Sequence, residues 1–412
     1  MDRSIKLSSP LLPVLSLAAL KQKLVIGAFF NFFLVALLGI LLRSFSITSI
    51  PLHYKFLLHG HSHFAFGGWI MPMLLWLILQ YFPMLAQKVA VHHWRNISVL
   101  LFLSAYGMLA SFPFQGYGAV SIIFSTISVF ASYYLAVVIW QASKELEPSI
   151  PIRFLKAGTF YLVLSSIGPF ATGPLLAMGK GGSTLYFDAI YFYLHFQYNG
   201  WFTFVILSVL ISILERKNIG QHSKKIYFLM NASCAPAFLL STLWHQPNLS
   251  FYLIGGVAAL LQVVAFFYLL NDFLKLKEKA SFENNLIKLG LFALGLKLLL
   301  QALSALPAIA NLAFENRNFV IAYLHLVMLG FISLLSIAFM IKEYPVLKTK
   351  ALKTALAAFL IAFTTTETLL AAQASGLSFS SFSYWLFGFS CLLPVAVFGM
   401  FSSIKKQSLL LD

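Results

Sequence analysis

The chain has 412 residues, of which 60% are hydrophobic and only 10% are charged. This composition excludes an ordinary soluble globular protein, which carries about 25% charged residues. The two cysteines, Cys234 and Cys391, lie far apart in apolar stretches, which excludes a disulfide framework and a cysteine-based metal cluster. The formal net charge of +16 would suit a nucleic-acid partner, but the distribution of Lys and Arg along the chain indicates a membrane instead. We therefore expect no nucleic acid.

Twelve apolar segments are long enough to cross a bilayer, whose hydrocarbon core of about 30 Å requires roughly 20 helical residues. We therefore expect an all-α polytopic membrane protein, one integral domain over residues 1–412 in contact with membrane lipid. The expected spans are 24–43, 56–81, 97–117, 119–141, 153–178, 184–213, 226–244, 250–274, 284–311, 318–342, 352–372 and 382–404. The division between the third and fourth spans rests on Gly116-Tyr117-Gly118 and is the least marked.

The basic residues orient these spans. With the N-terminus in the cytoplasm, 23 Lys and Arg residues fall in cytoplasmic segments, one (Lys297) falls inside the ninth span, and four fall outside. The four outer residues are Arg43, Lys55, Lys180 and Arg317. This asymmetry follows the positive-inside rule, and a helix count wrong by one would destroy it. We expect a multi-pass protein of a bacterial-type inner (plasma) membrane with both termini cytoplasmic.

Six of the ten histidines fall in the outer halves or at the outer ends of four spans, and none falls in an inner half. They are His59, His61 and His63 in the second span, His195 in the sixth, His245 at the end of the seventh and His325 in the tenth. A polar side chain at this depth is costly unless it finds a partner, so these histidines are functional candidates. The alternative is that they form hydrogen bonds between neighbouring helices.

Imidazole is a common ligand of haem iron and of copper. His59 and His63 are four residues apart and share one face of a helix, whereas His61 points to roughly the opposite side. A regular helix therefore cannot bring all three to a single metal ion.

The twelve-helix plan with histidines in helices 2, 6, 7 and 10 resembles subunit I of the haem–copper oxidase superfamily. The run from His61 to Pro72 resembles the family's second helix, which supplies a ligand of the low-spin haem. His195, followed by Asn199 and Gly200, resembles the copper-binding site in the sixth helix, and His325 in HLVMLG resembles the other low-spin haem ligand. The resemblance implies a b-type haem, with copper as a second metal.

This sequence departs from the family at two sites. The paired copper histidines after the seventh helix read His245-Gln246 here, and the high-spin haem ligand of the tenth helix is replaced by Tyr323. Tyrosinate can ligate haem iron. The segment HGHSHFAFGG and the tenth-helix histidine are also similar to the NnrS family, twelve-helix haem and copper proteins linked to nitric oxide stress, which does not need the full ligand set.

Two charged residues lie within spans, Lys297 in the ninth and Glu367 in the eleventh. They predict either a proton path toward the metal site or a buried salt bridge between these two helices. Asp188 and Tyr198, near His195, are candidates to hydrogen-bond a ligand histidine or to supply protons.

The resemblance implies electron transfer to oxygen or nitric oxide, with a cytochrome or another electron-donor subunit as partner. Electrons would arrive at a haem held by His325 and by His61 or His59, with His63 as a third candidate in the second helix. They would pass to a metal near His195 and His245. The catalytic candidates are Tyr198, Tyr323, Lys297 and Glu367.

Two other functions stay open. One is a non-enzymatic haem or copper protein of the NnrS kind. The other is a twelve-helix metal or proton-coupled transporter, against which the sequence shows no clear half-to-half repeat and no paired broken helices.

Overall fold

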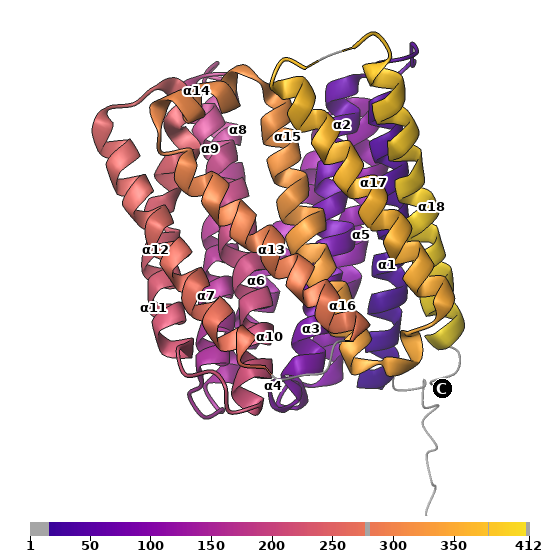
Figure 1. Ribbon diagram of the computed structural model, residues 1–412, viewed down its shortest axis with the longest axis vertical. Helices are drawn as coiled ribbons and strands as arrows, with labels where there is room; N and C mark the ends of the chain where they lie inside the picture. The colour runs from indigo at the N-terminus through magenta and orange to yellow at the C-terminus, as the bar shows by residue number, and fades with distance from the viewer. Residues whose placement is uncertain (1–15, 277–280, 378, 409–412) are drawn as a thin grey trace, which may run out of the picture.

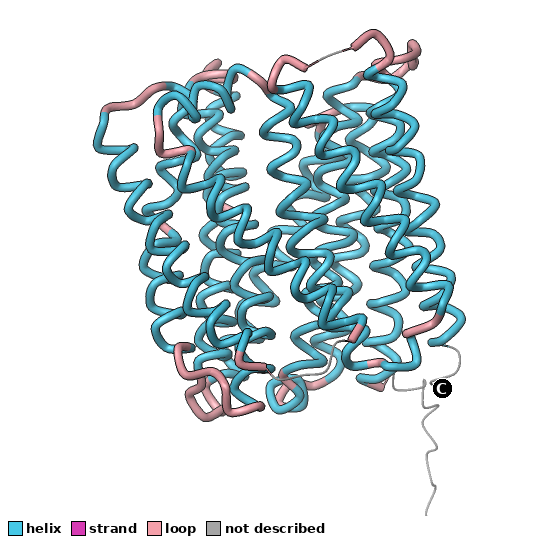
Figure 2. The backbone as a smooth tube through the Cα atoms, in the orientation of Figure 1, coloured by secondary structure: helices cyan, strands magenta, loops and turns pink. Residues whose placement is uncertain are grey.

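The computed structural model describes residues 16–276, 281–377 and 379–408, and within them the chain forms helices and no strand (Figure 2). Twelve helical spans are long and apolar enough to cross a membrane, and each overlaps one of the twelve predicted segments. The predicted all-α polytopic membrane fold is therefore confirmed. The prediction of one domain over residues 1–412 includes end segments outside the described residues.

Seven of the spans are single helices packed side by side (Figure 1). They are α1 (Leu17–Ser44), α5 (Val91–Gln115), α6 (Ala119–Ser143), α12 (Leu249–Leu274), α13 (Phe282–Leu303), α17 (Lys350–Ala374) and α18 (Phe382–Ser408). Short helices outside the spans are α4 (Pro83–Gln87), α14 (Pro307–Glu315) and η5 (Pro345–Leu347).

The other five spans are divided into shorter helices. The fifth span is α7 (Ile150–Ser165) with α8 (Ile167–Ala177), and the seventh is α11 (Ser223–Cys234) with the 3₁₀ helix η3 (Pro236–His245). In the second, sixth and tenth spans a π-helical segment separates two α-helices. These are α2 (Tyr54–Phe64), η1 (Ala65–Ile70) and α3 (Met71–Tyr81); α9 (Thr184–His195), η2 (Phe196–Phe202) and α10 (Thr203–Arg216); and α15 (Arg317–His325), η4 (Leu326–Ser333) and α16 (Leu334–Glu343).

The predicted boundaries are correct to within a few residues in most spans. Gly116, with φ +56°, ends α5 at the predicted division between the third and fourth spans. The ninth span was predicted too long, because α13 ends at Leu303 and a separate helix begins at Pro307. Proline has no backbone N–H to donate into the preceding turn, so it starts a helix more readily than it continues one.

In each π-helical segment one backbone carbonyl accepts a hydrogen bond from a polar side chain. Pro72 cannot donate to the Gly68 carbonyl of η1, and the Asn31 amide of α1 donates to it at 2.8 Å. In η2 the Thr203 hydroxyl donates to the Tyr198 carbonyl at 2.6 Å, five residues earlier. In η4 the Ser333 hydroxyl donates to the Met328 carbonyl at 2.7 Å, again five residues earlier. Polar side chains therefore hydrogen-bond to the backbone where the α-helical pattern is interrupted.

Packing differs sharply on the two sides of these π-helical segments. We call α2, α9 and α15 together the histidine half and α3, α10 and α16 the packed half; they lie at opposite ends of the bundle (Figure 1). In the packed half, 10 of 11, 12 of 14 and 8 of 10 residues are buried. In the histidine half the numbers are 3 of 11, 2 of 12 and none of 9. The packed half of these three spans is therefore buried in the hydrophobic core, and the histidine half is not.

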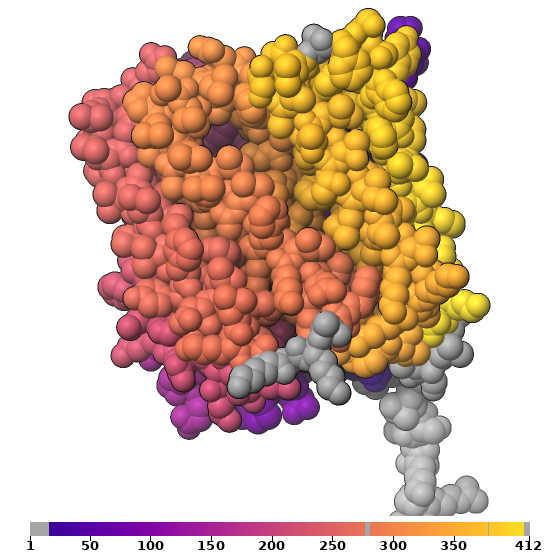
Figure 3. All heavy atoms as spheres, in the orientation of Figure 1, coloured from indigo at the N-terminus to yellow at the C-terminus, as the bar shows by residue number. Residues whose placement is uncertain are grey.

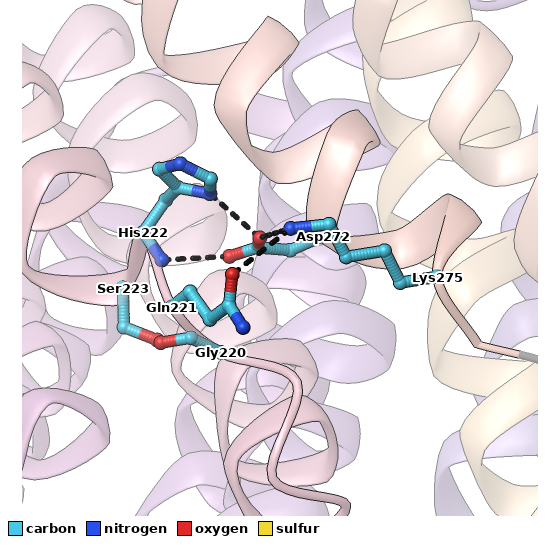
Figure 4. Close-up of polar contacts among 6 residues, drawn as sticks. All are labelled: Gly220, Gln221, His222, Ser223, Asp272 and Lys275. Carbon is cyan, nitrogen blue, oxygen red and sulfur yellow. Dashed lines mark hydrogen bonds and ion pairs between the residues drawn. The ribbon is translucent and has the colours of Figure 1, made fainter.

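Ion pairs and hydrogen bonds join loops at the packed end. The backbone N–H of His222 donates to Asp272 Oδ2 at 2.9 Å, and His222 Nδ1 lies 2.6 Å from Asp272 Oδ1 (Figure 4). Lys275 Nζ lies 3.6 Å from the same carboxylate, which is fully buried, and donates to Gln221 at 3.1 Å. This clamp fixes the loop between α10 and α11 against the end of α12.

The alternating spans place the predicted cytoplasmic loops at the packed end, where α1 begins and α18 ends (Figure 1). Nineteen of the 23 basic residues assigned to that side are described, and four, Arg3, Lys6, Lys277 and Lys279, lie outside the described residues.

Candidate functional site

The three histidines of α2 point in two directions, as the helical spacing predicts. His59 and His63 face the aromatic rings of Phe112 and Tyr117 at the end of α5. His63 stacks on Phe112 with centroids 4.5 Å apart, and its Nε2 lies 3.0 Å from the Tyr117 hydroxyl. His61 faces α1 instead, where a Cβ built on Gly39 would lie 3.6 Å from His61 Cε1. The other two histidines are thus held in an aromatic cluster, apart from His61.

His61 is only partly satisfied: it forms a backbone hydrogen bond with Val35 of α1, but one ring nitrogen is left over. Its Nδ1 is buried and has no hydrogen-bond partner among the described residues. Its electrostatic neighbours include His325 of α15 and Arg43 at the end of α1. The structure therefore brings His61 and His325, from the second and tenth spans, into one region.

His325 is held by a carboxylate. Its Nδ1 lies 2.9 Å from Glu367 Oε1 of α17, and the two side chains are 30% and 14% exposed. An imidazole whose Nδ1 binds a carboxylate keeps its Nε2 available and fixed in direction, which is the usual arrangement of a metal-ligating histidine. The second oxygen of Glu367 is buried and has no partner among the described residues.

His195 lies at the end of α9, fully buried, and both of its ring nitrogens are occupied. Nε2 lies 2.8 Å from the Cys234 carbonyl, and Nδ1 lies 3.0 Å from the Asn199 side-chain amide. Asn199 is one turn further along the same span, in η2. A metal could bind His195 only after one of these contacts was broken.

Lys297 continues this network. It is 1% exposed, and its Nζ donates to Asn199 Oδ1 and, at 2.7 Å, to Gln301 Oε1. The Gln301 amide donates in turn to Gln262 of α12 at 3.1 Å. The predicted salt bridge between Lys297 and Glu367 is wrong, because Glu367 binds His325 and Lys297 binds neutral amides. Lys297 and Gln301 are four residues apart on one helix face, a spacing that could have revealed the pair from the sequence.

His245 is separate from His195. Its Nε2 lies 3.4 Å from Asp188 Oδ2, and the neighbouring Trp244 donates to the other oxygen of Asp188 at 3.0 Å. Asp188 thus binds the predicted metal residue His245, not His195. No group of three or more His, Cys, Asp or Glu side chains suited to a metal ion occurs within the described residues. The described donors do not gather into a copper site, and copper binding stays a prediction from the sequence.

The two candidate tyrosines lie together. The rings of Tyr198 in η2 and Tyr323 in α15 meet edge to face with centroids 6.4 Å apart, and Tyr198 also lies 6.5 Å from the His195 ring. Tyr323 lies two residues before His325, so the two side chains point to roughly opposite sides of α15. The contact between the tyrosine rings joins the sixth span to the tenth.

The surface is hollowed near the histidine end. Figure 3 shows a depression among the orange atoms in the upper half of the molecule. A separate pocket of ≈ 450 Å³ at the start of α2 is lined by Pro51, His53, Phe56 and Pro113 among others, and contains none of the predicted site histidines.

Comparisons of the sequence with known proteins give no relative. No protein-family model matches the chain. No curated protein matches it either.

Proposed function

We propose that the chain is an integral membrane haem protein in which His61 and His325 would hold the haem iron. The single observation that carries this proposal is the fixed orientation of His325 by Glu367 at 2.9 Å, with His61, whose buried Nδ1 has no partner among the described residues, as an electrostatic neighbour. The proposal includes a bacterial-type inner membrane, both termini in the cytoplasm and the histidine half toward the opposite face.

The residues present fit a macrocycle in three respects. Two imidazoles from different helices lie near each other, and one of them is oriented by a carboxylate. The histidine half is loosely packed where the packed half is filled. His59 and His63 are held by Phe112 and Tyr117, which favours His61 as the second ligand.

A bound haem would supply one-electron chemistry. Glu367 would hold the proton on His325 Nδ1 and thereby tune the electron density of the imidazole. The proposed activity is electron transfer, with oxygen or nitric oxide as acceptor and a cytochrome or another electron-donor subunit as partner. Because the described residues assemble no second metal site, the proposal includes the non-enzymatic NnrS-like function beside the reductase.

The test is an absorption spectrum of the purified protein, oxidised and reduced, for the wild type and for His61→Ala and His325→Ala. We expect sharp reduced α-bands in the wild type that both variants lose, while His63→Ala, the matched control from the same helix, retains them. A wild type expressed with ample haem but lacking a Soret band would refute the proposal.

A transporter is the second candidate, and a specific observation favours it. Lys297 is fully buried among neutral amides, and three neighbouring spans are interrupted near their middle, a feature that transporters use at their binding sites. The sequence had shown no paired broken helices. Under this function, Lys297→Met would abolish proton or metal-ion flux in proteoliposomes, and Gln262→Leu, at the edge of the same network, would reduce it less.

A further inference from the structure

Cations are scarce at the histidine end of the bundle, and most of them gather near the candidate ligands. Of the four basic residues assigned to this end, Arg43 is an electrostatic neighbour of His61 and Glu367. Lys55 and Arg317 are electrostatic neighbours of His59, one turn before His63. These three, which we call the cation cluster, come from α1, α2 and α15, the helices that surround the proposed ligand site.

The cation cluster has no anionic partner at contact distance. Within the described ranges, no carboxylate lies within 4.0 Å of Arg43, Lys55 or Arg317, and no hydrogen bond is formed by their side-chain nitrogens. The packed end is different: Lys88, Lys275 and Lys348 pair with carboxylates at 3.2, 3.6 and 2.7 Å. Three acids lie at the same end of the bundle: Glu367 pairs with His325 through one oxygen, Asp188 pairs with His245, and Glu315, two residues before Arg317, forms no ion pair with the cluster.

Arg43 is the most informative member. It is partly buried in the last turn of α1, inside a span, while Lys55 and Arg317 are exposed. A cation at this depth is costly without a counter-charge. A guanidinium presents a planar pair of donors that matches a carboxylate, and such charge-assisted pairs are about twice as strong as neutral hydrogen bonds.

We propose that Arg43 and Arg317, with Lys55 beside them, form a carboxylate-binding site that holds the acidic edge of the ligand. This inference rests on the proposed function. It adds the chemical class of ligand that the site recognises, a tetrapyrrole with free carboxylates. Haem carries two propionate groups, and two arginines from different helices, Arg43 of α1 and Arg317 of α15, would supply one bidentate partner for each.

The experiment titrates apo-protein in detergent with hemin and, separately, with hemin dimethyl ester, whose carboxylates are blocked, and follows the Soret band. The proteins are the wild type, Arg43→Gln, Arg317→Gln and the double variant. Lys180→Gln removes the fourth basic residue of the same end and is the matched control. We expect the wild type to bind the free acid at least roughly tenfold more tightly than the ester.

Each arginine variant should weaken binding of the free acid by roughly tenfold and leave the ester unchanged, so the ester also reports that the variant is folded. Lys180→Gln should behave as the wild type. Equal affinity of the wild type for acid and ester, with no effect of either arginine, would overturn the inference, keep the proposed haem function and assign the cations to lipid phosphates. Failure of the wild type to bind either porphyrin would refute the proposed function together with this inference.

Discussion

The same three helices behave differently on the two sides of their π-helical segments. The packed half buries nearly every residue and contains no histidine. The histidine half leaves most of its residues partly exposed, although it lies within the same bundle. Under the proposed function, stability and ligand binding would depend on opposite ends of each span, so that the site could stay open without loss of the core. If the two halves are independent, substitutions in one should change ligand binding and substitutions in the other should change stability.

Removal of the proposed ligand should have the largest effect. His325→Ala should weaken haem affinity by more than roughly 100-fold, because even partners of metal ligands contribute 10–100-fold. The Soret and reduced α-bands of purified protein measure this. His63→Ala should bind haem normally. If His325→Ala also bound haem normally, the proposed role of the histidine half in ligand binding would be wrong.

The same Ile→Ala substitution should lower the free energy of unfolding more in the packed half than in the histidine half. Ile206 in α10 is fully buried, whereas Ile190 in α9 of the same span is partly exposed. Ile206→Ala should destabilise the apo-protein by about 2–5 kcal/mol, the range for a buried aliphatic residue, and Ile190→Ala by much less. Thermal unfolding in detergent measures both. Equal losses would show that the histidine half is packed as tightly as the other.

Loss of the carboxylate behind His325 should have a moderate effect. Glu367→Gln keeps the shape of the side chain but removes its charge, so haem affinity should fall by about tenfold. Thr368→Val, on an exposed position of the same helix, is the control. An unchanged haem spectrum and affinity in Glu367→Gln would show that Glu367 does not orient His325.

The clamp at the packed end should affect stability alone. Asp272→Asn weakens the contacts to His222 and Lys275 and should cost about 1 kcal/mol, with haem affinity unchanged. Glu145→Gln, which removes the exposed pair with Lys88, should cost less than about 0.5 kcal/mol. A change in haem affinity in Asp272→Asn would show that the two ends are coupled.

Much of the fold could be predicted from the sequence, because span length and loop charge depend on local composition. The opposite directions of His61 and His63 also followed from helical spacing alone. The contact of Lys297 with Gln301 could have been predicted from their spacing of four residues. Its contact with Asn199, from a distant span, could not. The assembly of His61 with His325, from distant spans, was expected only through the family resemblance.

The π-helical segments could not be predicted, because a single extra residue per turn leaves the apolar pattern almost unchanged. A hydroxyl that donates to the carbonyl five residues earlier, as Thr203 does to Tyr198, accompanies η2 and η4. The sequence alone does not show this contact, because a Ser or Thr can reach several backbone groups.

The π-helical segments also act as fixed joints between the two halves. Because each residue of a helix turns it by about 100°, one residue more or fewer in η1 rotates everything before it by that angle relative to α3. Deletion of Gly67 would leave the sequence LLHGHSHF intact and still turn His61 away from His325. The direction of the imidazoles is therefore decided by the number of residues in a segment that contains no histidine.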